Sequence, residues 1–205
     1  MSHDLPKIIS TTEMSASEAK WITLKKIKYS DQEGNERIWE SAERKTRKST
    51  GVDGVAIFAI LRSKTNSFPV STVVIEQYRP PIGKYVIGLI DEGETIEEAA
   101  KRELHEETGY TADETLQISP IIVSDPGMTN ANMQLVVLSV VMEGEITKPE
   151  PKLDPGEFIV TKVVEVAKLN SELEGDSLLP RFGFIVDARL SHLASGLELA
   201  KKLKI

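Results

Sequence analysis

Residues 88–110, GLIDEGETIEEAAKRELHEETGY, constrain the fold more than any other stretch of this chain. Thr95 and Glu98 have the spacing of a capping box, in which each side chain bonds the backbone amide of the other residue. Gly109 stands where helices commonly end in a left-handed turn. The stretch therefore predicts a helix over residues 96–108.

Two glutamates of this helix are predicted to face the protein interior. At about 100° per residue, Ala100 and Leu104 mark an apolar arc of the helix surface. Glu103 and Glu107 fall inside this arc, and Glu106 lies at its edge. An isolated buried carboxylate costs several kcal/mol unless it is protonated or meets a cation.

A divalent cation would remove both the cost of burial and the repulsion between neighbouring carboxylates. Hard cations prefer oxygen ligands, and spacings of three and four residues bring several oxygens to one helical face. Glu94 is a fourth candidate ligand, and Arg102 is placed to orient a glutamate through a bidentate pair. The alternative, an ordinary solvated helix face, holds for the outward side chains of Glu97, Glu98, Lys101 and His105.

Gly88, Glu94 and the run RELHEETGY at residues 102–110 resemble the Nudix box, Gly-x5-Glu-x7-Arg-Glu-U-x-Glu-Glu-x-Gly-U, where U is bulky and aliphatic. Tyr110 departs mildly from this pattern. The resemblance implies hydrolysis of a nucleoside diphosphate linked to another group, with Mg or Mn held by Glu103, Glu106 and Glu107. It also implies catalytic roles for Glu106 and Arg102.

The N-terminal region is predicted to form a hairpin. Residues 21–29 and 37–44 read as strands around a turn at Gly34 and Asn35. A two-stranded hairpin is too small to be stable alone, so it must pack on the main domain or on a second chain. Trp21 and Trp39 lie on these strands, either as core or interface residues or as platforms that stack on a flat base.

Further stretches are similar to the ADP-sugar pyrophosphatase branch of the Nudix family, which is best known for cleaving ADP-ribose. They are TRKSTGVDGVAIFAIL, EQYRPP, SDPGMTN and PGEF. The resemblance implies a homodimer that exchanges its N-terminal sheet, with Trp21 and Trp39 sandwiching the adenine and Arg44 and Arg79 contacting the substrate. It also implies a catalytic base at Glu157. Judged from position alone, Arg79 could be a solvated strand end and Glu157 a surface acid.

The chain departs from this branch just before Gly88. The branch usually carries Glu-x-Pro-Ala there, and the backbone carbonyl of that alanine coordinates a metal. In this chain Ile87 is followed directly by Gly88, so these four residues are absent. Four fewer residues shorten a strand by about 13 Å. One reading has the Ile87 carbonyl take over, and a second has the chain bind ADP-ribose without hydrolysing it. A third function, hydrolysis of oxidised nucleoside diphosphates, also stays open.

Alternation of strands with few helices predicts an α/β fold with a mixed sheet, which the resemblance makes a Nudix α/β/α sandwich with an added N-terminal antiparallel sheet. Residues 1–50 would serve dimerisation and adenine binding, and residues 51–205 would form the hydrolase domain. Core strands are expected at residues 53–62, 69–78, 114–123, 133–142 and 158–167, and helices at residues 169–179 and 187–203.

The composition limits the binding partners and the cellular compartments that are expected for this chain. The net charge of −7 and the lack of a long basic stripe argue against nucleic-acid binding. Without a run of about 18 apolar residues, no membrane span is expected. The absence of cysteine excludes thiol chemistry and suits a reducing compartment, so a cytoplasmic or nuclear location is expected.

Overall fold

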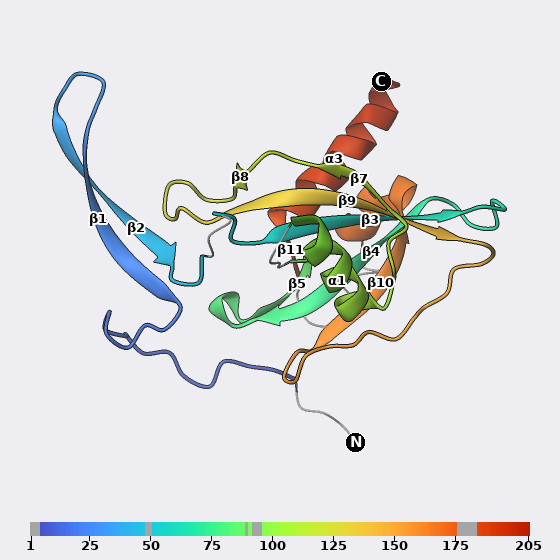
Figure 1. Ribbon diagram of the computed structural model, residues 1–205, viewed down its shortest axis with the longest axis horizontal. Helices are drawn as coiled ribbons and strands as arrows, with labels where there is room; N and C mark the ends of the chain where they lie inside the picture. The colour runs from blue at the N-terminus through green and yellow to red at the C-terminus, as the bar shows by residue number, and fades with distance from the viewer. Residues whose placement is uncertain (1–4, 48–50, 89, 92–95, 176–183) are drawn as a thin grey trace.

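The computed structural model describes residues 5–47, 51–88, 90–91, 96–175 and 184–205. Figure 1 shows α1 against one face of the central sheet, α3 behind the other, and a hairpin of β1 and β2 reaching away from this body. The strands are β1 Ile22–Ser30, β2 Glu36–Arg44, β3 Val55–Ser63, β4 Ser71–Arg79, β5 Lys84–Gly88, β6 Ile90–Asp91, β7 Glu114–Ile118, β8 Ile122–Val123, β9 Asn132–Met142, β10 Ile159–Glu165 and β11 Ile185–Val186. The helices are α1 Ile96–Thr108, α2 Leu169–Glu174 and α3 Ala188–Leu203, with short 3-10 turns η1 Pro80–Ile82 and η2 Val166–Lys168.

The central sheet is mixed, as predicted. Its order is β11-β5-β4-β3-β9-β7, with β10 paired to β4, β6 to β3 and β8 to β9. The β3–β9 pair is parallel along the whole of β3, and β11 runs parallel to β5, whereas β3–β4 and β4–β10 are antiparallel.

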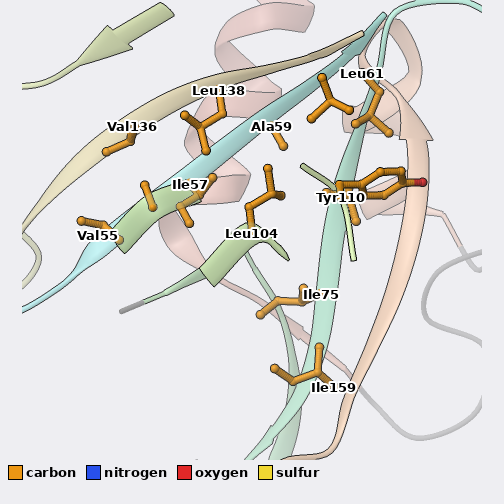
Figure 2. Packing of buried hydrophobic residues seen from close by; sticks show 13 residues of the cluster. Val55, Ile57, Ala59, Leu61, Ile75, Leu104, Tyr110, Val136, Leu138 and Ile159 are labelled. Carbon is orange, nitrogen blue, oxygen red and sulfur yellow. The ribbon is translucent and has the colours of Figure 1, made fainter. Parts of the chain in front are cut away.

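Strand β3 is apolar along most of its length because helices cover both faces of the sheet. Val55 and Ile57 belong to a core cluster with Leu104 of α1. The intervening Ala56 and Phe58 belong to a second cluster, which contains residues of α2 and α3. Figure 2 shows the first cluster, with Leu104 and Tyr110 among the side chains of β3, β4, β9 and β10. Because helices cover both faces of the central sheet, the body is an α/β/α sandwich.

Helix α1 begins and ends at the predicted residues, 96 and 108. Its buried side chains include Ala100, Leu104, Glu103 and Glu107, so the predicted inward arc is confirmed. The predicted N-terminal cap, which involves Thr95, and the candidate ligand Glu94 lie outside the described residues.

Gly109 ends α1 in the left-handed region, with φ of +75°. Its amide donates to the carbonyl oxygen of His105 at 2.8 Å. A Cβ atom here would lie 2.6 Å from the backbone oxygen of Glu150 and 2.8 Å from the Cβ of Pro149. Only glycine therefore fits between the end of the helix and the loop that precedes β10.

Gly109→Ala should destabilise the fold by about 3 kcal/mol, because the strained φ and the clash with the backbone add. The thermal midpoint should fall on the order of 10 °C. Gly34→Ala is the matched control, since Gly34 has φ of +83° but a Cβ atom there would meet nothing within 4 Å. Calorimetry of both variants checks this, and equal losses would show that the close approach to the loop has no cost.

Two predicted elements differ from the structure. The expected strand at residues 114–123 is divided into β7 and β8, because Pro120 cannot donate a ladder hydrogen bond. The residue before it, Ser119, still donates its amide to the carbonyl oxygen of Leu135. Helix α2 ends at Glu174, earlier than the expected residue 179, and residues 176–183 lie outside the described part of the chain.

Helix α3 follows the prediction. Asp187 caps its N-terminus by accepting the amide of Arg189 at 2.8 Å, and Leu190 and Ala194 are fully buried. Among the helices of the described residues, none combines the length and hydrophobicity that a transmembrane span requires.

The β1–β2 hairpin is antiparallel, with Ile27 opposite Trp39 and Ile22 opposite Arg44. Side chains alternate between the two faces, so Trp21 and Trp39 lie on one face and Leu24, Ile38 and Arg44 on the other. Trp21 is 70% exposed and Leu24 is also 70% exposed. Both faces of the hairpin therefore present apolar side chains that its own chain does not cover.

Candidate active site

A cleft of about 370 Å³ gathers residues from widely separated parts of the chain. Arg44 comes from the end of β2 and Arg79 from the end of β4, while Glu107 comes from α1 and Glu157 from the loop before β10. These four predicted site residues therefore line one cavity. The remaining lining residues are Asp53, Gly54, Ile75, Gln77, Pro81, Ile82, Val86, Gly88, Ala131, Asn132, Met133, Asp187 and Arg189.

The glutamates of α1 divide into two kinds. Glu103 and Glu107 are buried, at 9% and 6% exposure, while the side chain of Glu106 is 40% exposed. Arg102 contacts Glu103 through one terminal nitrogen and Glu106 through the other. Arg102 thus bridges two glutamates, where the sequence predicted a bidentate pair with one of them. Glu107 alone of these three lines the cleft, within the described residues.

The donor set of this helix face suits a hard divalent cation. Two buried carboxylates lie one turn apart, and oxygen atoms are the ligands that such cations prefer. Within the described residues no three Asp, Glu or His side chains converge as a ready cluster, and Arg102 pairs with both Glu103 and Glu106. The guanidinium thus supplies positive charge to these two carboxylates.

Glu157 is an exposed side chain at the margin of the cleft. Its amide donates to the carbonyl oxygen of Asp154 at 3.0 Å, and its own Oε2 accepts the amide of Asp154 at 3.2 Å. This local turn, which contains Gly156 at φ of +95°, fixes where the loop enters β10. A carboxylate with this access to solvent can reach a water molecule in the cleft.

Trp21 and Trp39 are not among the residues that line this cleft. Trp39 is 50% exposed and donates its indole N–H to the carbonyl oxygen of Gly127 at 2.9 Å. Trp21 precedes β1, and its carbonyl oxygen accepts the amide of Lys45. Within one chain, both tryptophans therefore belong to the projecting hairpin.

Five polar residues of the cleft were missed from the sequence: Asp53, Gln77, Asn132, Asp187 and Arg189. Asp187 and Arg189 form an ion pair of 2.8 Å at the start of α3. An aspartate directly before an amphipathic run is a helix-capping signal, which could have marked Asp187 as an ordered side chain. Asp53 and Asn132 lack any such local signal, because they meet only through the pairing of β3 with β9.

Gly88 is the last residue of β5 and lines the cleft. It lies opposite Ile75 in the β4–β5 pair. Residue pairs Ile185–Val86 and Val186–Ile87 bring β11 alongside β5. A Cβ atom on Gly88 would lie 3.4 Å from the Cβ of Asp187. The first glycine of the motif is thus packed against the start of α3.

Asp53 is a charged group of the cleft whose pKa shifts. Its side chain is 3% exposed, and hydrogen bonds from Arg47 lower its pKa, outweighing the opposing effect of burial. A depressed folded-state pKa stabilises the fold fully above the unfolded value of about 3.9, and this contribution is lost as the pH falls through the folded value.

Asp53→Asn should therefore lower the free energy of unfolding by about 3 kcal/mol at pH 7, because it leaves Arg47 without its charge partner. The difference from the unmodified chain should shrink as the pH falls below about 4, where the aspartate itself becomes protonated. Urea unfolding at pH 7, 5 and 3 measures both quantities. A difference that stays constant over this range would contradict the assigned pKa shift.

Comparison with known proteins shows which family the chain belongs to. The family model described as the NUDIX domain matches residues 52–182 of the sequence. The chain belongs to the Nudix family. This Nudix chain is 42% identical over 205 residues to the ADP-ribose pyrophosphatase of Saccharomyces cerevisiae, covering 97% of this chain and 87% of that protein.

Other relatives extend this result. An uncharacterized Nudix hydrolase of Schizosaccharomyces pombe is 39% identical over 208 residues, covering 98% of both chains. The ADP-sugar pyrophosphatase of Mus musculus is 34% identical over 199 residues, covering 94% of this chain and 88% of the mouse protein. The crystal structure of an ADP compounds hydrolase matches with a TM-score of 0.56 at 19% identity, over 99% of this chain and 97% of that one, and so supports the Nudix fold. The Nudix chain is thus an enzyme of the hydrolase type.

Proposed function

We propose that this Nudix hydrolase cleaves ADP-ribose, or a related ADP-sugar, into AMP and a sugar phosphate. One observation carries the proposal: Arg44, Arg79, Glu107 and Glu157 line the same cleft. The names of the yeast and mouse relatives support this substrate class.

The two arginines suit the diphosphate of such a substrate. A diphosphate linkage carries two negative charges, and guanidinium groups pair with phosphate oxygens through fixed, planar hydrogen bonds. Arg44 and Arg79 end their strands on the cleft, so both can reach one bound linkage. Glu157 would orient the attacking water and take its proton.

The glutamates of α1 would hold divalent ions, and Glu107 among them lines the cleft. Members of the Nudix family generally use divalent metal ions, and we propose Mg or Mn here, held by Glu103, Glu106 and Glu107. A divalent ion held there would supply positive charge that offsets the charge of the diphosphate and would lower the pKa of a bound water molecule. Arg102 holds Glu103 and Glu106 in place, and by this contact it would serve catalysis without touching the substrate.

Residues 1–50, which include the hairpin, would serve dimerisation and adenine binding. Both tryptophans lie outside the cleft of their own chain, and Leu24 and Ile38 are 70% and 61% exposed. A homodimer that exchanges hairpins would cover these apolar side chains and bring Trp21 and Trp39 to an adenine, which has a flat face for stacking.

Leu24→Asp should convert the dimer to a monomer, because it places a charge in the covered face. Light scattering should change from twice 22.7 kDa for the unmodified chain to a single 22.7 kDa chain. Leu199→Asp is the control, since Leu199 is a 55% exposed leucine on α3. A monomeric unmodified chain, or a variant that remains dimeric, would contradict the exchanged hairpin.

Product analysis tests the proposed reaction. The purified chain with Mg and ADP-ribose should release AMP and ribose 5-phosphate in equal amounts, resolved by ion-exchange chromatography. The second candidate function is a binding protein, favoured by the direct run of Ile87 into Gly88. Intact ADP-ribose together with measurable affinity would establish that alternative, and turnover of oxidised nucleoside diphosphates alone would redefine the substrate.

A further inference from the structure

Arg47, which follows β2, forms a forked ion pair with Asp53, which precedes β3. Arg47 donates from Nε to Oδ1 of Asp53 at 2.8 Å and from Nη2 to Oδ2 at 2.6 Å. The same Nη2 donates to the backbone oxygen of Asn130 at 2.7 Å and to its Oδ1 at 3.1 Å. One guanidinium thus joins the start of β3 to the loop before β9.

Asp53 and Asn132 close this network from the other side. Asp53 Oδ2 accepts the amide of Asn132 at 3.0 Å, and the amide of Asp53 donates to Oδ1 of Asn132 at 3.0 Å. Asn132 Nδ2 donates to the carbonyl oxygen of Gly51 at 2.9 Å. With Asp53 3% exposed, these bonds form in surroundings that exclude most water, where hydrogen bonds to charged groups are strongest.

The loop before β9 also contacts β2 directly. The amide of Ala42 donates to the carbonyl oxygen of Met128 at 3.0 Å, and Ala42 forms a parallel bridge with Thr129. The indole of Trp39 donates to Gly127. Contacts at residues 39, 42 and 47 therefore flank Arg44, the hairpin residue that lines the cleft.

We infer that Arg47, Asp53 and Asn132 form a positioning clamp, which sets Arg44 and the hairpin relative to the cleft and so controls substrate affinity rather than the chemical step. The inference rests on the proposed function. Asp53 and Asn132 line the cleft themselves, so a change in the clamp alters its wall as well as the reach of Arg44.

A matched pair of variants separates this role from general stabilisation. Arg37 pairs with Asp31 at 2.8 Å at the far end of the same hairpin and does not line the cleft. Arg47→Gln should raise the KM for ADP-ribose about tenfold or more and leave kcat within about threefold, since binding is lost while chemistry is kept. Arg37→Gln should leave both values unchanged.

Arg47→Lys covers the case in which Arg47→Gln fails to fold. Lysine keeps the charge but cannot form the fork, so KM should still rise. A fall in kcat at constant KM, or equal behaviour of the Arg47 and Arg37 variants, would overturn the clamp.

Hydrogen exchange provides a second readout that needs no substrate. Amides of residues 39–47 and 125–132 should exchange faster in the Arg47 variants than in Arg37→Gln, because the loop and β2 separate more often. If the unmodified chain does not hydrolyse ADP-ribose, the proposed function fails while this exchange difference still tests the clamp. Unchanged exchange in the Arg47 variants would remove the structural basis of the inference.

Discussion

Glu107→Gln is expected to reduce turnover of ADP-ribose by roughly 10³-fold or more, because it removes the buried carboxylate that faces the cleft. The amide has nearly the same shape, so the packing of α1 should survive. The loss should come from the missing negative charge, which is what a divalent cation requires of its ligands. Steady-state kinetics with Mg measures the effect.

Glu98→Gln is the matched control on the same helix. Glu98 is exposed on the outer face of α1, so its removal changes the helix charge equally without altering the cleft. A second measurement separates metal loss from other causes. Added Mn should raise the thermal midpoint of the unmodified chain and of Glu98→Gln but not that of Glu107→Gln. A fully active Glu107→Gln would refute the assignment of this face.

Glu157→Gln is expected to lower kcat by about 10²–10⁴-fold, the range that general acid–base catalysis contributes, while KM changes little. Here the stabilisation by Mn should remain, because Glu157 comes from the loop before β10 and not from α1. The two glutamate variants should therefore differ in metal response while sharing a loss of activity.

Glu145→Gln serves as the control for this loop. Glu145 is an exposed carboxylate of the same connection between β9 and β10, and it does not line the cleft. The kcat of Glu145→Gln should stay within about threefold of that of the unmodified chain, while that of Glu157→Gln falls. An unchanged kcat in Glu157→Gln would assign the base to another residue.

Much of the body could be predicted because its patterns are local. The period of α1 placed Glu103 and Glu107 inside, and both are buried. Strands β3 and β4 are apolar because the sheet is covered on both faces, and a continuous apolar run can be recognised in the sequence itself. Tyr110, the mild departure from the motif, packs in the core and donates its hydroxyl to the carbonyl oxygen of Thr147 at 2.6 Å.

The parts of the site that could not be predicted depend on strand register and on side-chain competition. Asp53 meets Asn132 only because β3 pairs in parallel with β9, so neither residue carries a local signal. Arg102 was expected to pair with one glutamate, yet two carboxylates lie within its reach and it bridges both. The sequence likewise could not predict that the hairpin extends away from the body, because its strand pattern is the same whether or not the hairpin packs on the sheet.

Anomalous diffraction from a crystal of the unmodified chain grown with manganese tests the central claim most directly. The claim is that the inward carboxylates of α1 exist to hold cations. We predict an anomalous peak within coordination distance of Glu107, joined by Glu103 or Glu106 after Arg102 shifts from one of them. Clear density for these side chains with no peak beside them, at manganese concentrations that support turnover, would contradict it.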